Sequence, residues 1–289
     1  MLAQVSLTPA ESKKLIAKAV TQIGMVKKAI AEGIVVMHPS SSTIFVAEEI
    51  IGERPKTPVW VCGTIVSKGA CMGGGAYKDS TKHSRSVTRS PEDFANSWVV
   101  EGKKLSTGIT LRDLFAKMGP KDVYIKGVNA LDIEGTVGVL IGNRMEGGTI
   151  GRVVAASRKK GFSLIFPVGL EKLIPIGIED AAKEAIKTKY DYSMGIACGL
   201  YPCKGVVVTE VKAVEILSGA TAIPISAGGL DGAEGAVTLV IKGEKEQVEK
   251  AIEYVEQSKG ALLPKANPPR CEGCSAAICD FPVKEKPWV

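Results

Sequence analysis

The stretch Gly33–Ile51, GIVVMHPSSSTIFVAEEII, decides the fold. It opens with the apolar run Ile34–Met37, which follows a glycine and ends at His38-Pro39, as expected for a short buried strand. A turn of hydroxyl residues comes next, and the apolar residues after it recur at helical spacing, with acidic residues on the other side. The stretch therefore predicts a strand, a tight turn and a helix.

The turn consists of Ser40, Ser41, Ser42 and Thr43 and has two interpretations. Ser and Thr are preferred helix caps, so the residues are consistent with a capped helix after a strand. Free backbone N–H groups at a helix start also attract anions, and hydroxyls add donors. The same four residues are therefore candidate ligands of an anionic substrate.

Composition restricts the classes of function. The chain has 289 residues, 45% hydrophobic and 24% charged, which is typical of globular proteins and compatible with two domains. Its net charge of +6 is spread along the chain, so we expect no nucleic-acid partner. The sequence has no apolar run of about 18 residues and no signal-peptide pattern, so we expect no membrane association and a cytoplasmic location. Seven cysteines favour thiols or metal ligands over disulfides.

Strands and helices alternate over residues 1–195. Thr8, Pro9 and Glu11 form a capping box that begins a helix. Further strands are predicted over 59–66, 94–101, 123–126 and 163–168, with helices between several of them. This alternation predicts an α/β domain with a parallel sheet.

The pattern changes after Gly205. Residues 206–257 read strand, helix, strand, strand, helix, which is the order of a small ferredoxin-like α+β unit. We therefore assign a second domain to 204–262, although the segment can equally be an elaboration of the first sheet. Residues 263–289 form a cysteine-bearing tail.

A second segment carries a family resemblance. Lys126–Asp132, KGVNALD, is followed by Gly135-Thr136-Val137-Gly138. Together with the turn after the first strand, it resembles the superfamily of ribose-5-phosphate isomerases, glucosamine-6-phosphate deaminases and CoA transferases. The resemblance covers about 10–170 and implies a Rossmann-like sheet in which Ser40–Thr43 and Gly127–Asp132 face one cleft. Pro39 and serines stand where the family's first loop has glycines.

Three residues near these turns are candidate catalytic groups. If the superfamily cleft is retained, Asn129 and Asp132 bind substrate hydroxyls or act as a base, whereas a loop Asn or Asp is also an ordinary turn former. His38 follows the first strand and can serve as acid, base or ligand contact, or as a structural hydrogen-bond partner in the turn.

Two other segments can contact an anion. Gly148 and Thr149 lie in Gly147–Gly151, which either binds a second phosphate at a helix start or is a tight strand–helix connection. Glu171-Lys172 offers an acid and an amine near the end of a strand.

The cysteines suggest a metal. Cys271, Cys274 and Cys279 have spacing that suits zinc or an iron–sulfur cluster, with a fourth ligand from Cys203 or another cysteine. The alternatives are a tail of reduced thiols and, for Cys203, a buried small hydrophobe.

These patterns together predict an enzyme. The family resemblance implies an isomerase or a transferase. Its substrate is a small anionic metabolite: a sugar phosphate, a carboxylate or a CoA ester. We expect a homo-oligomer. The competing hypothesis is a non-catalytic protein, either a ligand-binding redox sensor or a scaffold for a metal or cluster.

Overall fold

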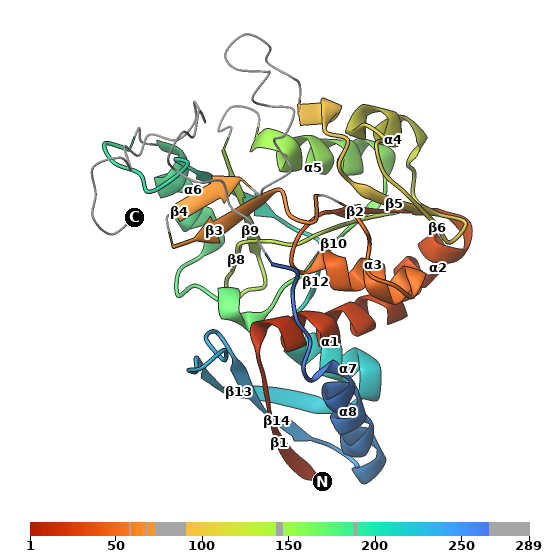
Figure 1. The fold of residues 1–289 in the computed structure, drawn as a ribbon, viewed down its shortest axis with the longest axis vertical. Coiled ribbons are helices and arrows are strands. Elements are labelled where there is room, and N and C mark those ends of the chain that lie inside the picture. Colours follow the sequence, from red (N-terminus) through yellow and green to blue (C-terminus); the bar gives the residue numbers. More distant parts are fainter. Residues whose placement is uncertain (58, 68, 73–90, 143–146, 188–189, 266–289) are drawn as a thin grey trace.

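The computed structural model describes residues 1–57, 59–67, 69–72, 91–142, 147–187 and 190–265 (Figure 1). Over these ranges the chain has a mixed α/β fold. Its helices are α1 (Pro9–Gln22), α2 (Gly24–Glu32), α3 (Thr43–Ile51), α4 (Leu111–Lys117), α5 (Gly148–Lys160), α6 (Ile178–Lys187), α7 (Glu210–Ser218) and α8 (Lys245–Ser258), with short 3-10 turns η2 (Pro91–Asp93) and η4 (Leu170–Lys172). Its strands are β1 (Leu2–Leu7), β2 (Ile34–His38), β3 (Gly63–Val66), β4 (Gly69–Met72), β5 (Trp98–Glu101), β6 (Lys104–Ser106), β7 (Val123–Lys126), β8 (Ala130–Leu131), β9 (Val137–Ile141), β10 (Ser163–Pro167), β11 (Gly199–Cys203), β12 (Val206–Val208), β13 (Thr221–Ala227) and β14 (Val237–Lys242).

The central sheet has six strands in the order β12-β10-β7-β2-β5-β6. Strands β12, β10, β7 and β2 run parallel, whereas β5 is antiparallel to β2 and β6 to β5. The α/β class is confirmed, but the sheet is mixed rather than wholly parallel. A tight hairpin makes β6 antiparallel to β5, because Gly102 and Lys103 both have positive φ, as a two-residue type I′ turn requires.

Helices cover both faces of the central sheet, with α1 and α3 on one side and α4 and α5 on the other (Figure 1). Side chains alternate between these layers along each strand. Val35 and Ile125 belong to the core beneath α1 and α3, whereas Val36 and Tyr124 belong to the core beneath α5. A strand buried on both faces explains the uninterrupted apolar run of β2.

A second sheet, in the order β1-β14-β13, is antiparallel and packs against α7 and α8 (Figure 1). The structure differs from the predicted ferredoxin-like unit in one strand. The expected first strand, β12, pairs with β10 in the central sheet, and its place beside β14 is taken by β1 from the N-terminus. Leu239 and Ile241 of β14 share one core with Val35 and Ile125, so the segment 204–262 is continuous with the first sheet.

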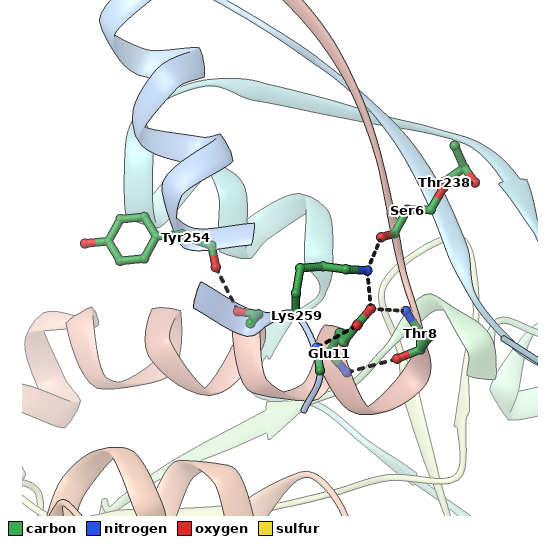
Figure 2. Close-up of polar contacts among 8 residues, drawn as sticks. Ser6, Thr8, Glu11, Thr238, Tyr254 and Lys259 are labelled. Atoms are coloured by element: carbon green, nitrogen blue, oxygen red, sulfur yellow. Dashed lines mark hydrogen bonds and ion pairs between the residues drawn. The ribbon is translucent and has the colours of Figure 1, made fainter. Parts of the chain in front are cut away.

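The end of α8 is attached to the start of α1 by Glu11 (Figure 2). Glu11 closes the expected capping box with Thr8, whose backbone N–H donates to its carboxylate at 2.9 Å. The same carboxylate accepts hydrogen bonds from the Lys259 ammonium at 2.6 Å and from the Gly260 N–H at 2.9 Å. Lys259 also donates to the carbonyl of Ser6. One acidic side chain thus joins β1, α1 and the segment after α8.

Candidate functional site

The turn between β2 and α3 uses two of its hydroxyls to fix its own shape. The Thr43 N–H donates to Ser40 Oγ at 3.2 Å, and Thr43 Oγ1 donates to the carbonyl of His38 at 2.5 Å. Ser40 Oγ and Thr43 Oγ1 lie 2.9 Å apart. Ser40 and Thr43 therefore brace the turn that begins the helix, whereas Ser42, the N-cap residue, makes no side-chain cap hydrogen bond. Ser41, between them, is half-buried.

Ser42 differs from its neighbours. It is buried, at 1% exposed, and its Oγ has no hydrogen-bond partner among the residues that the structure describes. A buried hydroxyl without a partner is costly unless a ligand or water satisfies it. Gly127, just after β7, lies beside it: a Cβ on Gly127 would come within 2.6 Å of Ser40 Oγ and 3.5 Å of Ser42 Oγ. The structure therefore brings together the two turns on which the resemblance depends.

His38 and Lys126 are paired neighbours at the ends of parallel strands β2 and β7. Paired residues of parallel strands point to the same face, so both side chains lie on the face of Tyr124. The His38 ring stacks on Phe94 with centroids 4.7 Å apart, and its Nδ1 is 3.2 Å from Tyr124 Oη. Burial and the Lys126 charge hold the pKa of His38 well below its usual value, so the imidazole is neutral at pH 7.

Lys126 is the unusual group of this site. It is 9% exposed, and burial lowers the pKa of its ammonium to about 8. It interacts electrostatically with the thiols of Cys62 and Cys203, whose own pKa values burial raises to about 11 and about 12. Within the described ranges, no carboxylate forms an ion pair with it. The positive charge at the end of β7 is therefore uncompensated.

A second amine, that of the half-buried Lys172, follows β10. Lys172 donates to the carbonyl of Val128 at 2.6 Å, and burial, with repulsion from Lys13 and Lys126, lowers its pKa to about 8. Neighbouring Glu171 forms its ion pair with Lys13. Glu210, at the start of α7, accepts from the Leu170 N–H at 2.9 Å. Burial raises the pKa of Glu210, which weakens its value as a counter-charge.

The two acid and amide candidates of the later turn are occupied within the fold. Asp132 accepts hydrogen bonds from the Thr136 N–H at 2.7 Å and from the Ile178 N–H, at the start of α6, at 3.0 Å. Asn129 Oδ1 accepts from the Leu140 N–H of β9 at 3.0 Å. These contacts position β8, β9 and α6. A catalytic role for Asn129 or Asp132 stays a prediction, and the turn-forming role accounts for every contact just given.

Gly148 and Thr149 lie at the start of α5, where the structure shows a packed connection. Gly147, the cap residue, has a φ of +69°, and a Cβ there would lie 2.4 Å from the Tyr201 ring. Glycine is therefore needed for both the turn and the close approach of the ring. Gly148 is buried and Thr149 half-buried. A phosphate site at these two residues stays a prediction.

The metal hypothesis falls mainly on residues that the structure does not describe. Cys271, Cys274 and Cys279 lie outside the described ranges. Cys203 is buried in the core beneath α5, and its Sγ lies 3.6 Å from the carbonyl of Tyr201. Within the described residues no three His, Cys, Asp or Glu side chains gather as a metal site would require. Cys203 as a fourth ligand therefore stays a prediction.

Comparison with protein-family models, with curated protein sequences and with solved structures finds no match for this chain. Across the residues that can be described, no helix has the length and apolar character needed to cross a membrane.

The sequence interpretation assigned no role to Lys126, although it lies in the quoted turn segment. The signal was present: a lysine directly before Gly127, at the end of the apolar strand VYIK. Such a position can place an amine at the carboxyl edge of a sheet, where ligands bind in α/β proteins. Its electrostatic interaction with two thiols depends on β11 and on the segment before β3, which sequence spacing does not bring together.

Proposed function

We propose that this protein is an enzyme that binds a small anionic metabolite at the carboxyl ends of β2, β7 and β10. The observation that carries the proposal is the pair of amines of buried Lys126 and half-buried Lys172, neither of which forms an ion pair with a carboxylate among the described residues. Buried charges are normally paired, so an anion from solution is the natural partner. The unpartnered Ser42 hydroxyl, which lies beside Gly127, the residue after Lys126, supplies a further donor.

The substrate class follows from this chemistry. A phosphate or carboxylate satisfies two ammonium groups and a hydroxyl donor, which fits a sugar phosphate, a carboxylic acid or a CoA ester. The resemblance to the ribose-5-phosphate isomerase, glucosamine-6-phosphate deaminase and CoA-transferase superfamily supports the same class, and on that basis we propose isomerase or transferase chemistry on a Rossmann-like sheet.

The test is a thermal-shift screen of the full chain with inorganic phosphate, sugar phosphates, carboxylates and acyl-CoAs. A ligand that binds only the folded state raises the melting temperature. We expect Lys126→Met and Lys172→Met to weaken the binding of a positive ligand at least about tenfold, which is about 1.4 kcal/mol. The control is Lys28→Met, because Lys28 is exposed on α2, which leads into the opposite end of β2.

Equal shifts in the wild type and in both site variants would contradict the proposal. Binding without turnover of any substrate in the positive class would favour the non-catalytic, ligand-sensing alternative. Either result leaves the fold assignment unchanged.

We also propose that Cys271, Cys274 and Cys279 hold zinc or an iron–sulfur cluster, with Cys203 as the fourth ligand. The support is their spacing alone. Metal and sulfide analysis of anaerobically purified protein tests it. Stoichiometric zinc indicates a structural site and iron with sulfide indicates a cluster, whereas metal-free protein contradicts the proposal. Cys203→Ser should release the metal only if Cys203 is a ligand.

A cytoplasmic location and a homo-oligomeric state complete the proposal. The location rests on the cysteine content, which suits a reducing compartment. Cell fractionation and light scattering of the purified chain test the two statements separately.

A further inference from the structure

Helices α4 and α5 cover the same face of the central sheet (Figure 1), and a groove of about 340 Å³ lies between them. This volume is within the range of about 300–1,000 Å³ that is usual for small-molecule sites. The described residues that line this α4–α5 groove include Ala116 of α4 and Ala155 and Ala156 of α5, and none of them belongs to the strand-end site. The hollow exists because these short side chains leave a space that longer ones would fill.

The α4–α5 groove is strongly basic. Among the described residues that line it, four are cationic and one is acidic: Arg112, Arg152, Lys159 and Lys160 against Glu92. The α5 residues of the lining recur three or four apart from Arg152 to Lys160, so they form one face of the helix. A concave surface with charges of one sign concentrates ligands of the opposite sign. The groove therefore suits an anion.

The helix dipoles do not account for all of these cations. Lys159 and Lys160 lie in the last turn of α5, where positive charge is favourable, whereas Arg112 is the second residue of α4, where it is unfavourable. Asp93 holds the Arg112 guanidinium through one hydrogen bond of 2.9 Å, and an arginine carries five N–H donors. Lys160 donates to the carbonyl of Ala116 at 3.5 Å and so bridges the two helices. Arg112 and Lys160 are thus held at the groove by the fold.

We propose that the α4–α5 groove is a second ligand site, which binds a nucleotide such as ATP. Arginine and lysine are the side chains that suit phosphate groups. The base has an apolar surface to cover, formed by the alanines and by Phe115, whose ring is 9% exposed and stacks on Phe162 with centroids 6.1 Å apart. This site shares no residue with the strand-end site and goes beyond the proposed function.

The test is isothermal titration calorimetry of the full chain with ATP, adenosine and tripolyphosphate. We expect ATP to bind at least about tenfold more tightly than either of the others, because adenosine lacks the phosphates and tripolyphosphate lacks the base. The titration is repeated with the double variant Lys126→Met/Lys172→Met, which lacks both amines of the strand-end site. ATP binding should be retained in this variant.

Two changes alter the groove while leaving the core intact. Ala116→Leu together with Ala155→Leu fills the groove, and both alanines are exposed, so the fold should be kept. Lys159→Glu reverses one charge of the lining. Each change should weaken ATP binding at least about tenfold. The matched control is Lys117→Glu, because Lys117 is exposed on α4 and is not part of the lining. Circular dichroism and a melting curve show whether each variant is folded.

The outcomes separate this inference from the proposed function. Absence of ATP binding, or ATP binding that is unchanged in Lys159→Glu and in the filled variant, would overturn the inference. Equal losses in Lys159→Glu and Lys117→Glu would overturn it too, since they would indicate attraction to net charge alone. Tripolyphosphate binding as tight as that of ATP would contradict the assignment to a nucleotide. Loss of ATP binding in Lys126→Met/Lys172→Met would overturn the inference and support the strand-end anion site instead.

Discussion

Lys126 ends β7 with only 9% of its surface exposed and, among the described residues, without an ion pair to a carboxylate. Removing an ion from water costs free energy unless a partner group compensates for the lost hydration. The folded state therefore tolerates this residue rather than gaining stability from it, and a bound anion would recover part of the cost. A residue that destabilises the fold at a strand end is a functional candidate on physical grounds.

This cost predicts that the free energy of unfolding depends on pH. The pKa of Lys126 is about 8 in the folded state and about 10.5 when unfolded, so between these values the unfolded chain binds more protons. The free energy of unfolding should therefore rise with pH across this window, by up to about 3 kcal/mol from this residue. Urea titrations from pH 7.5 to 10 should show a smaller rise for Lys126→Met than for the wild type, whereas Lys28→Met should match the wild type. Equal pH dependence in all three proteins would show that folding does not lower the pKa of Lys126.

Sequence reasoning identified some single residues of the candidate site. It identified the hydroxyl turn and His38, because a short apolar strand followed by small polar residues has a local signature. It could not separate Ser42 from Ser40 and Thr43, since the hydrogen bonds that occupy the latter two depend on backbone geometry. It also gave Asp132 a catalytic reading, whereas in the structure both carboxylate oxygens accept backbone hydrogen bonds.

At the scale of the element, the β2–α3 turn separates capping from ligand binding. Ser40→Ala removes the acceptor of the Thr43 N–H and should lower the free energy of unfolding by about 1 kcal/mol. Ser42→Ala removes a hydroxyl with no partner in the described structure, so it should leave stability unchanged or raise it slightly while weakening anion binding. Urea unfolding and the thermal shift with a bound anion measure the two effects. The reverse pattern would mean that Ser42 serves the fold.

Glu11 of the α1 capping box also binds the residues that follow α8. Burial raises the pKa of Glu11, but hydrogen bonds from Lys259, Thr8 and Gly260, with the charge of Lys259, outweigh it and leave the pKa below its usual value. The carboxylate therefore contributes stability above its unfolded pKa, near 4.5, and this contribution is lost as the pH falls through the folded value.

We expect Glu11→Ala to lower the free energy of unfolding by about 1–3 kcal/mol at pH 7, because the cap and two N–H donors lose their acceptor. Lys259→Met removes one donor only and should cost less. Chemical denaturation at pH 7 and pH 3.5 checks both statements, since the difference between wild type and Glu11→Ala should shrink at the lower pH. A pH-independent difference would argue against the ionised carboxylate.

At the scale of the whole molecule, the two main sheets share one hydrophobic core. Helix α1 contacts β10 and β12 of the central sheet and also α7 and α8, the helices of the small sheet, so neither layer can be removed without exposing the other. The exchange of strands has the same effect, because β1 completes the small sheet and β12 completes the central one.

The isolated segment 204–262 should therefore not fold. It lacks β1, and its own β12 has no partner strand in the absence of β10. Circular dichroism of this fragment should show little regular structure, and the full chain should unfold in one cooperative transition. Adding a peptide of residues 1–8 alone should not rescue the fragment, since the α1 surface is also missing. A folded, cooperatively melting fragment would establish an independent domain.

The sequence by itself determined the local elements: the buried strand of Gly33–Ile51 with its turn and helix, the capping box at Thr8, and the alternation that gives the α/β class. Periodicity and capping are properties of neighbouring residues, so they can be read from the chain. Only the tertiary structure decided that β5 runs antiparallel, that β1 joins β14, and that Lys126 is buried at the end of β7. Strand pairing and burial depend on contacts between residues far apart in the chain. These contacts leave no periodic signal in the sequence.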